Sequence, residues 1–208
     1  MTRTKICGLT THGALETAVA AGADAVGLVC DVETDTPREI PPELAVELSR
    51  AAPPFVTTVL VTMPATPDHA VDLAARIQPD VVQVHGEFTV GDLAYLSANV
   101  SGDVMAAVTP EAAGDLDTVA DALVVDSLDD AGAGGTGETH DWAATRDLVT
   151  SLSSPIVLAG GLTPANVADA VDAVGPFAVD VASGVEAAPG RKDPGAVAAF
   201  VRAAGGRP

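Results

Sequence analysis

Cysteine and lysine are scarce in this chain of 208 residues, and long apolar runs are absent. Two cysteines are too few for a disulfide framework, which favours a reducing compartment. No run approaches the ~18 apolar residues of a membrane-spanning helix. The first residues, MTRTKIC, also lack the apolar segment of a signal peptide. We therefore expect a cytoplasmic protein that has no membrane partner.

Basic residues are few, and the chain is strongly acidic. Ten Lys and Arg against 29 Asp and Glu give a formal net charge of −19, and the carboxylates are spread along the whole sequence. An evenly acidic surface argues against binding to nucleic acid or to an anionic membrane. Because salt screens self-repulsion, this pattern favours a halophilic protein, with an ordinary acidic protein as the alternative.

Short β-branched runs alternate with longer alanine-rich segments, about one pair per 26 residues. This alternation predicts a parallel sheet with helices between its strands. Eight units favour a single-domain (β/α)8 TIM barrel over residues 1–208, rather than an open doubly wound sheet. The predicted strands are Thr4–Cys7, Ala25–Cys30, Phe55–Val61, Val81–His85, Asp103–Val108, Ala122–Asp126, Pro155–Ala159 and Ala178–Val181.

Capping residues mark several of the predicted helices. Threonines precede His12–Ala21, and the segments Pro41–Ala52 and Pro67–Ile77 begin with proline, which the first helical turn tolerates. Two later helices follow the same pattern of cap, first-turn proline and terminal glycine. Their cap, proline and glycine are Thr163, Pro164 and Gly175 in one helix, and Asp193, Pro194 and Gly205 in the other.

Polar residues at the ends of the predicted strands indicate the chemistry, since a barrel of this class carries its active site on the loops that follow the strands. Cys7 ends strand one and Asp126 ends strand six, so a thiol and a carboxyl face each other as a general base and a general acid. The thiol needs a lowered pKa to act as a base, and the sequence does not show what would lower it. The alternative is that Cys7, like Cys30, is a buried small side chain.

Glycine-rich segments after strands six, seven and eight predict phosphate-binding loops, because glycine lets backbone N–H groups approach an anion closely. Such barrels commonly bind phosphate with these loops and with a short extra helix. The alternative is that the glycines only make tight turns. The candidate residues are Gly134, Gly135, Thr136, Gly137, Gly160, Gly161, Ser183 and Gly184.

Other residues are placed to contact a substrate at the mouth of the barrel. Arg38, in the long loop after strand two, could hold a carboxylate in a bidentate fork. Gln83 and His85 end strand four, and we expect both at the substrate site. We predict a hydrogen-bonded role for His85, and no metal site, since no second histidine ends a strand.

Taken together, these strand ends resemble the phosphoribosylanthranilate isomerase family of tryptophan biosynthesis. The matching motifs, in chain order, are KICG, PR, QVHG, VVDS, GGTG, LAGGL, DVASGVE and GRKD. The resemblance implies an Amadori rearrangement of N-(5-phosphoribosyl)anthranilate, with no metal or organic cofactor. It implies a small phosphorylated sugar–anthranilate substrate as the partner, and a monomer or a homodimer.

The resemblance also implies roles for individual residues. Asp126 would protonate the ring oxygen of the sugar, and Cys7 would then remove the C2′ proton. Arg38 would bind the anthranilate carboxylate, and Asp180 would lie near the ribose hydroxyls.

Three alternatives remain, of which the first performs the same class of rearrangement. A related sugar isomerase of histidine biosynthesis would carry aspartate at position 7. A pentose-phosphate epimerase would need paired histidines and aspartates around a metal. A non-catalytic phosphate-binding barrel would not need both Cys7 and Asp126.

Overall fold

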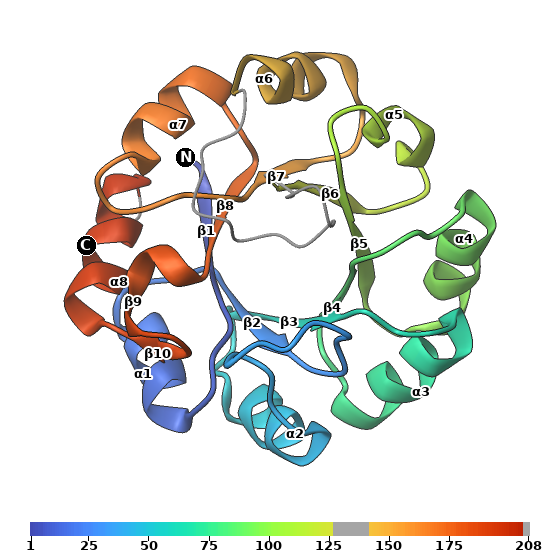
Figure 1. The fold of residues 1–208 in the computed structure, drawn as a ribbon, viewed down its shortest axis with the longest axis horizontal. Helices are drawn as coiled ribbons and strands as arrows, with labels where there is room; N and C mark the ends of the chain where they lie inside the picture. The colour runs from blue at the N-terminus through green and yellow to red at the C-terminus, as the bar shows by residue number, and fades with distance from the viewer. Residues whose placement is uncertain (127–141, 206–208) are drawn as a thin grey trace.

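The computed structural model, which describes residues 1–126 and 142–205, forms a closed barrel of eight parallel strands (Figure 1). Each strand pairs with its neighbours in chain order, and the last strand pairs with the first. The predicted TIM barrel is therefore confirmed. Its strands are β1 (Arg3–Cys7), β2 (Ala25–Val29), β3 (Thr57–Thr62), β4 (Val81–Val84), β5 (Asp103–Val108), β6 (Ala122–Val125), β7 (Ile156–Leu158) and β8 (Ala178–Val181).

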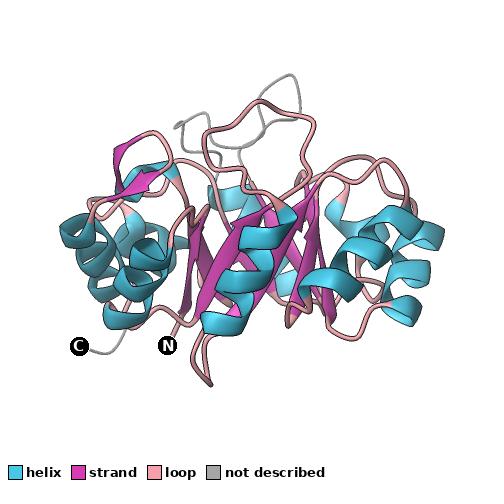
Figure 2. Ribbon diagram, turned by 90° about the horizontal axis from the view of Figure 1, so that it is seen from below, coloured by secondary structure: helices cyan, strands magenta, loops and turns pink. Residues whose placement is uncertain are grey.

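Helices surround the barrel as an outer layer, and a small hairpin follows β8 (Figures 1 and 2). None of the described helices is long and apolar enough to cross a membrane. The helices are α1 (His12–Ala20), α2 (Pro42–Ala51), α3 (Pro67–Ile77), α4 (Val90–Asn99), α5 (Ala113–Leu116), α6 (Trp142–Ser151), α7 (Val167–Val174) and α8 (Pro194–Ala203). A 3₁₀ helix, η1 (Ser183–Val185), leads into the hairpin of β9 (Glu186–Ala188) and β10 (Arg191–Lys192), which the sequence did not predict.

Several predicted capping residues hold helix ends. The side chains of Thr11 and Asp193 each accept a hydrogen bond from the backbone N–H three residues ahead, at 3.1 and 2.8 Å, and Thr66, which was not predicted as a cap, does the same at 3.3 Å. Gly175 ends α7 in the left-handed conformation, with a φ of 65°. The local sequence thus determines where these helices start and stop.

Two predicted boundaries are wrong by two residues or more, and several others differ by one residue. Phe55 does not begin β3: it is fully exposed with a φ of 73°, and the strand starts at Thr57. Thr163 does not cap α7, which begins at Val167. The Asn166 side chain instead accepts a hydrogen bond from Thr163 N at 2.7 Å. That bond forms a separate turn before the helix.

Alternation along the strands divides the core into two layers. Ile6 of β1 and Val179 of β8 belong to the layer between the barrel and the helices. Cys7 belongs to the smaller cluster inside the barrel. Lys5, two residues before Cys7, and Asp180, which pairs with Lys5 in register, reach each other inside the barrel as well. The period of two residues therefore brings polar side chains from β1 and β8 into the interior.

Three aspartates each link two neighbouring strands at their amino ends: β1 with β2, β3 with β4, and β5 with β6. Each stands directly before an even-numbered strand and accepts a hydrogen bond from the second residue of the strand before it. We call these three contacts the aspartate clamps. They are Asp24 with Thr4 N, Asp80 with Thr58 N, and Asp121 with Val104 N, each at 2.8 Å. The residue before β8 is Phe177 instead, and Arg3 lies over its ring at 4.3 Å.

The outer surface carries most of the negative charge. Of the acidic side chains in the described ranges, those of Asp180 and Glu186 are buried, and the other acidic residues are at least partly exposed. A net charge of −19 on a surface of this kind makes the folded chain repel itself at low salt. We therefore expect the melting temperature to depend on ionic strength.

We predict that the melting temperature rises steeply between low salt and molar KCl, because the Debye length shrinks to ~3 Å at 1 M. Each kcal/mol of relieved repulsion raises the melting temperature by about 2–4 °C in a chain of this size. Thermal melts followed by circular dichroism across a KCl series measure the effect. Sucrose stabilises proteins without screening charge, so a sucrose series is the control. A flat KCl response would contradict a stability limited by surface charge.

Candidate active site

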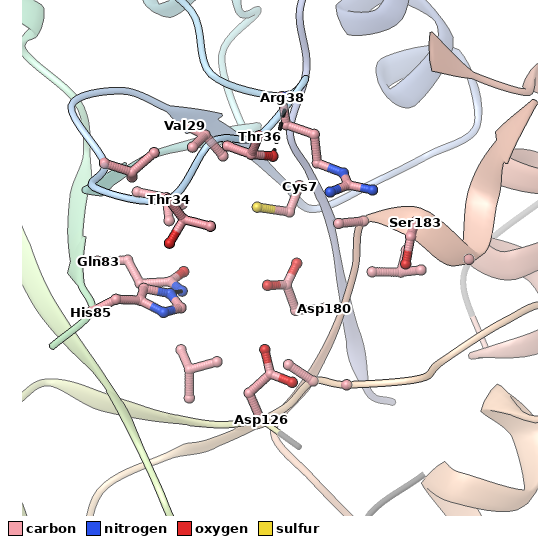
Figure 3. Close-up of a pocket in the computed structure, with 18 of the residues that line it drawn as sticks. Cys7, Val29, Thr34, Thr36, Arg38, Gln83, His85, Asp126, Asp180 and Ser183 are labelled. Atoms are coloured by element: carbon pink, nitrogen blue, oxygen red, sulfur yellow. Dashed lines mark hydrogen bonds between the residues drawn. The ribbon is translucent and has the colours of Figure 1, made fainter. Parts of the chain in front are cut away.

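One cavity of about 300 Å³ opens at the carboxyl ends of the strands (Figure 3). Its wall comes from the ends of β1, β2, β3, β4, β6, β7 and β8 and from the long loop after β2. It gathers all the predicted site residues that the structure describes, which are Cys7, Arg38, Gln83, His85, Asp126, Gly160, Gly161, Asp180, Ser183 and Gly184. Gly134, Gly135, Thr136 and Gly137 lie outside the described residues.

Cys7 ends β1 with its thiol directed into the cavity (Figure 3). It pairs in register with Gly27 of β2, where a Cβ atom would lie 2.7 Å from the Cys7 sulfur. Only glycine at position 27 therefore leaves room for the thiol. Burial raises the pKa of Cys7, and the charges of Lys5 and Lys192 offset only part of that rise. The resting side chain is a neutral thiol.

Lys5 and Asp180 form a buried ion pair beside Cys7. Lys5 Nζ lies 2.7 Å from Asp180 Oδ2, and the two side chains are 4% and 9% exposed. Burial alone would lower the pKa of Lys5, but Asp180 and Cys7 outweigh it and the pKa is raised. Lys5 is therefore a charged ammonium. Asp180 Oδ1 is also buried and has no hydrogen-bond partner among the described residues, so it keeps a free acceptor at the cavity.

Gln83 and His85 form a second polar pair on the opposite wall (Figure 3). Gln83 Nε2 lies 2.7 Å from His85 Nε2. Burial and the charge of Lys5 lower the pKa of His85 to about 4, so its ring is neutral at pH 7. With the Gln83 amide donating, His85 Nε2 accepts and the ring proton resides on Nδ1. Gln83 Oε1 is buried without a partner in the described part of the chain.

Asp126 follows β6 directly and reaches the cavity from the side away from Cys7. In Figure 3 its carboxylate points inward, and Asp180 lies between it and Cys7. The two predicted catalytic groups thus share one cavity, supplied by strands β1 and β6. No group of three or more His, Cys, Asp and Glu in the described ranges is arranged to hold a metal ion.

Arg38 is held by a network that the sequence analysis missed. Its Nε and Nη2 atoms donate to the two carboxylate oxygens of Glu186, both at 2.9 Å. Lys192 Nζ donates to Glu186 Oε1 at 2.8 Å and to the Ala182 carbonyl at 3.0 Å. These bonds hold the pKa of Glu186 below its usual value, although burial opposes the shift. One edge of the Arg38 fork is therefore occupied, and a substrate carboxylate would have to use the Nη1 end.

Backbone geometry at the remaining wall suits close approach by a ligand. Gly160 and Gly161 have φ values of 83° and 60°, a region that favours glycine. Gly184 lies so close to the loop after β7 that a Cβ atom would meet the Leu162 carbonyl oxygen at 1.9 Å. Ser183 and Gly184 belong to η1, the short helix expected after strand eight. Larger side chains at these glycines would disturb the wall.

Two of the residues that the sequence analysis missed share one sequence signal. The chain has only two lysines, Lys5 and Lys192, and both are buried at this site, 3% and 8% exposed. A surface that avoids lysine leaves those that remain as candidates for specific roles. Glu186 carried no such signal, since acidic residues are abundant.

Comparison with known proteins gives consistent matches. A model of the family "N-(5'phosphoribosyl)anthranilate (PRA) isomerase" matches residues 4–203. The chain is 62% identical to an N-(5'-phosphoribosyl)anthranilate isomerase of the halophilic archaeon Natronomonas pharaonis, over 99% of each sequence.

Two solved structures are similar over 99% of each chain. One is the phosphoribosyl anthranilate isomerase of Thermotoga maritima, with 35% identity and a TM-score of 0.87. The other is a phosphoribosyl anthranilate isomerase in complex with reduced 1-(o-carboxyphenylamino)-1-deoxyribulose 5-phosphate, with 34% identity and a TM-score of 0.83.

Proposed function

The chain belongs to the N-(5′-phosphoribosyl)anthranilate isomerase family, and on this premise we propose that Cys7 and Asp126 carry the reaction in the cavity described above. The activity is an Amadori rearrangement in tryptophan biosynthesis. It converts N-(5-phosphoribosyl)anthranilate into 1-(2-carboxyphenylamino)-1-deoxyribulose 5-phosphate, an aldose-to-ketose isomerisation. The observation that carries the residue assignment is the presence of a carboxyl and a thiol on different sides of one cavity.

The reaction needs one proton delivered and one removed. Asp126 protonates the furanose ring oxygen, and the C1′–O bond breaks to give a Schiff base. Cys7, as the thiolate, takes the proton from C2′, and the electron pair left behind forms the enolamine. The enolamine then tautomerises to the ketone. Positioned acid and base groups typically contribute about 10²–10⁴-fold each.

The two charged ends of the substrate, the anthranilate carboxylate and the phosphate, bind to different walls of the cavity. Arg38 is the cation that binds the anthranilate carboxylate. Glu186 accepts hydrogen bonds from Nε and Nη2 of Arg38, so the Nη1 end is left to donate to the substrate. The glycine segments at Gly160, Gly161 and Gly184 offer backbone N–H groups to the phosphate, and Gly134–Gly137, outside the described residues, stays a predicted contributor. Gln83, His85 and Asp180 supply polar contacts between the two ends.

We predict that Arg38→Lys raises KM about 10–100-fold with a smaller effect on kcat, since charge-assisted hydrogen bonds of a planar fork are lost. Lysine cannot hold Glu186 with two donors and bind a carboxylate at the same time. Initial rates across a substrate series measure the change. Arg76→Lys, which alters an arginine paired with exposed Glu43 on α2, is the matched control. An unchanged KM in Arg38→Lys would remove Arg38 from the substrate site.

Direct turnover tests the activity itself. The substrate carries an anthranilate fluorophore, and its fluorescence should fall when the purified protein is added in molar KCl. Chromatography against the authentic ketose identifies the product, which has the same mass as the substrate. The Cys7→Ser/Asp126→Asn double variant is the control for spontaneous decay. Decay at the same rate with both proteins would overturn the assignment.

We also propose a cytoplasmic location and a single barrel domain for the whole chain. Both cysteines are free in the structure, which suits a reducing compartment. For the quaternary state we expect a monomer or a homodimer, and sedimentation analysis in molar KCl distinguishes them.

A further inference from the structure

We propose that Lys5 and Asp180 act as an opposed pair of positioning residues that sets the ionisation of Cys7. In this arrangement the buried ammonium of Lys5 stabilises the thiolate, and the carboxylate of Asp180 opposes it. The inference rests on the proposed role of Cys7 as the base. It adds a function for Lys5, to which the proposed reaction gives no role.

Strand geometry brings the three groups together. Lys5 and Cys7 are two residues apart on β1, so both side chains point into the barrel. Asp180 stands opposite Lys5 in the β1–β8 register, and the Lys5 Nζ to Asp180 Oδ2 distance is 2.7 Å. The side chains of the pair are 4% and 9% exposed, so water screens them little.

The ammonium can act on both neighbours because it has three N–H donors. One donates to Asp180, and the positive charge of Lys5 also acts on the Cys7 side chain two residues along the strand. Asp180 holds the long lysine side chain in place beside the thiol. The same carboxylate places a negative charge near the sulfur, which disfavours the thiolate.

The pKa of Cys7 reflects this balance. Burial raises it most, the Lys5 charge lowers it, the Asp180 charge raises it, and the Lys192 charge lowers it. Four other titratable groups line the cavity, on other elements. His85 is neutral and Arg38 is engaged with Glu186, whereas Asp35 belongs to the loop after β2 and Asp126 approaches from β6. Lys5 and Asp180 are therefore opposite in sign and act on the same thiol.

The test measures Cys7 ionisation without substrate, so its outcome does not depend on turnover. In a Cys30→Ala background, the rate of alkylation by iodoacetamide is followed against pH. Lys5→Met should raise the apparent pKa and slow alkylation about tenfold or more at neutral pH, since one pKa unit changes the thiolate fraction tenfold below the pKa. Asp180→Asn should shift the pKa in the other direction and speed alkylation. The shifts should persist in molar KCl.

Lys5→Met leaves a buried carboxylate without its counter-ion and could unfold the chain. The double variant Lys5→Met/Asp180→Asn removes both charges, and its pKa should fall between those of the single variants. Arg76→Met, which removes an exposed cation outside the barrel, should leave alkylation unchanged. Thermal melts of each variant establish which are folded.

Opposite shifts in the folded variants would support the inference. Shifts of the same sign, or no shift in Asp180→Asn and the double variant, would overturn it. If Cys7→Ser kept normal turnover, the proposed base would fail while the ionisation result stood. If Cys7→Ser were inactive and ionisation did not move, only the role of Lys5 would fail.

Discussion

Replacing Cys7 by serine should lower kcat about 10²–10⁴-fold, the range typical for loss of a general base. Serine has nearly the size of cysteine, so the contact with Gly27 and the cavity wall stay as they are. Its hydroxyl does not ionise near neutral pH, and C2′ keeps its proton. KM should change little, because the groups that face the ends of the substrate are untouched.

The pH dependence of kcat provides a second test of the Cys7→Ser variant. Burial raises the pKa of Cys7 above its usual value despite Lys5 and Lys192. The thiolate fraction, and with it kcat of the parent enzyme, should therefore still be rising with pH above neutrality. Cys7→Ser should lose this rise. Cys30→Ala, which changes the other buried cysteine in the outer core layer, is the matched control and should keep both the turnover and its pH profile.

A Cys7→Ser enzyme within a few-fold of the parent would mean that another group takes the proton. Cys7 would then be a packed side chain of the barrel interior, where it contacts its neighbours in the inner cluster. Steady-state rates measured at fixed KCl over about pH 6–9, the range in which thiols titrate, separate the two cases.

Replacing Asp126 by asparagine should have an effect of similar size, about 10²–10⁴-fold on kcat. The amide fills the same space at the end of β6 but has no acidic proton for the ring oxygen. The C1′–O bond would then have to break with an unprotonated leaving oxygen. Substrate binding should be largely kept, since the size and polarity of the side chain are preserved.

Rapid mixing with excess enzyme measures this directly, because ring opening precedes every later step. Asp121→Asn is the matched control at the other end of the same strand. Asp121 accepts a hydrogen bond from Val104 N at 2.8 Å, far from the cavity, so this change should affect stability rather than turnover. Equal losses of kcat in both variants would indicate a structural effect of changing β6, and would remove Asp126 from the mechanism.

The barrel and its helix ends could be predicted from the sequence because local rules determine them. Alternating β-branched runs and capping side chains act within a few residues, and Thr11 and Asp193 cap the helices that they were expected to cap. Phe55 shows where this fails. Its apolar side chain resembles the start of a strand, but its left-handed backbone lies in the turn before β3.

The site was predictable where a residue ends a strand, and not where its partner is distant in sequence. Cys7 and Asp126 could be placed by the barrel topology alone. The Arg38–Glu186 contact joins residues 148 positions apart through the unpredicted hairpin, and the Lys5–Asp180 contact joins residues 175 apart. No short-range pattern encodes such contacts. They arise when β8 closes on β1 and the hairpin folds onto the loop after β2.

The aspartate clamps have a consequence for dividing the chain into fragments. A break between α4 and β5 leaves Asp24 with Thr4 and Asp80 with Thr58 in the first fragment, and Asp121 with Val104 in the second. A break between β3 and α3 would put Thr58 in the first fragment and Asp80 in the second, so this clamp could form only after the two fragments associate. Complementation of co-expressed halves should therefore succeed more readily at the first position, where every clamp forms within a single fragment before the two associate.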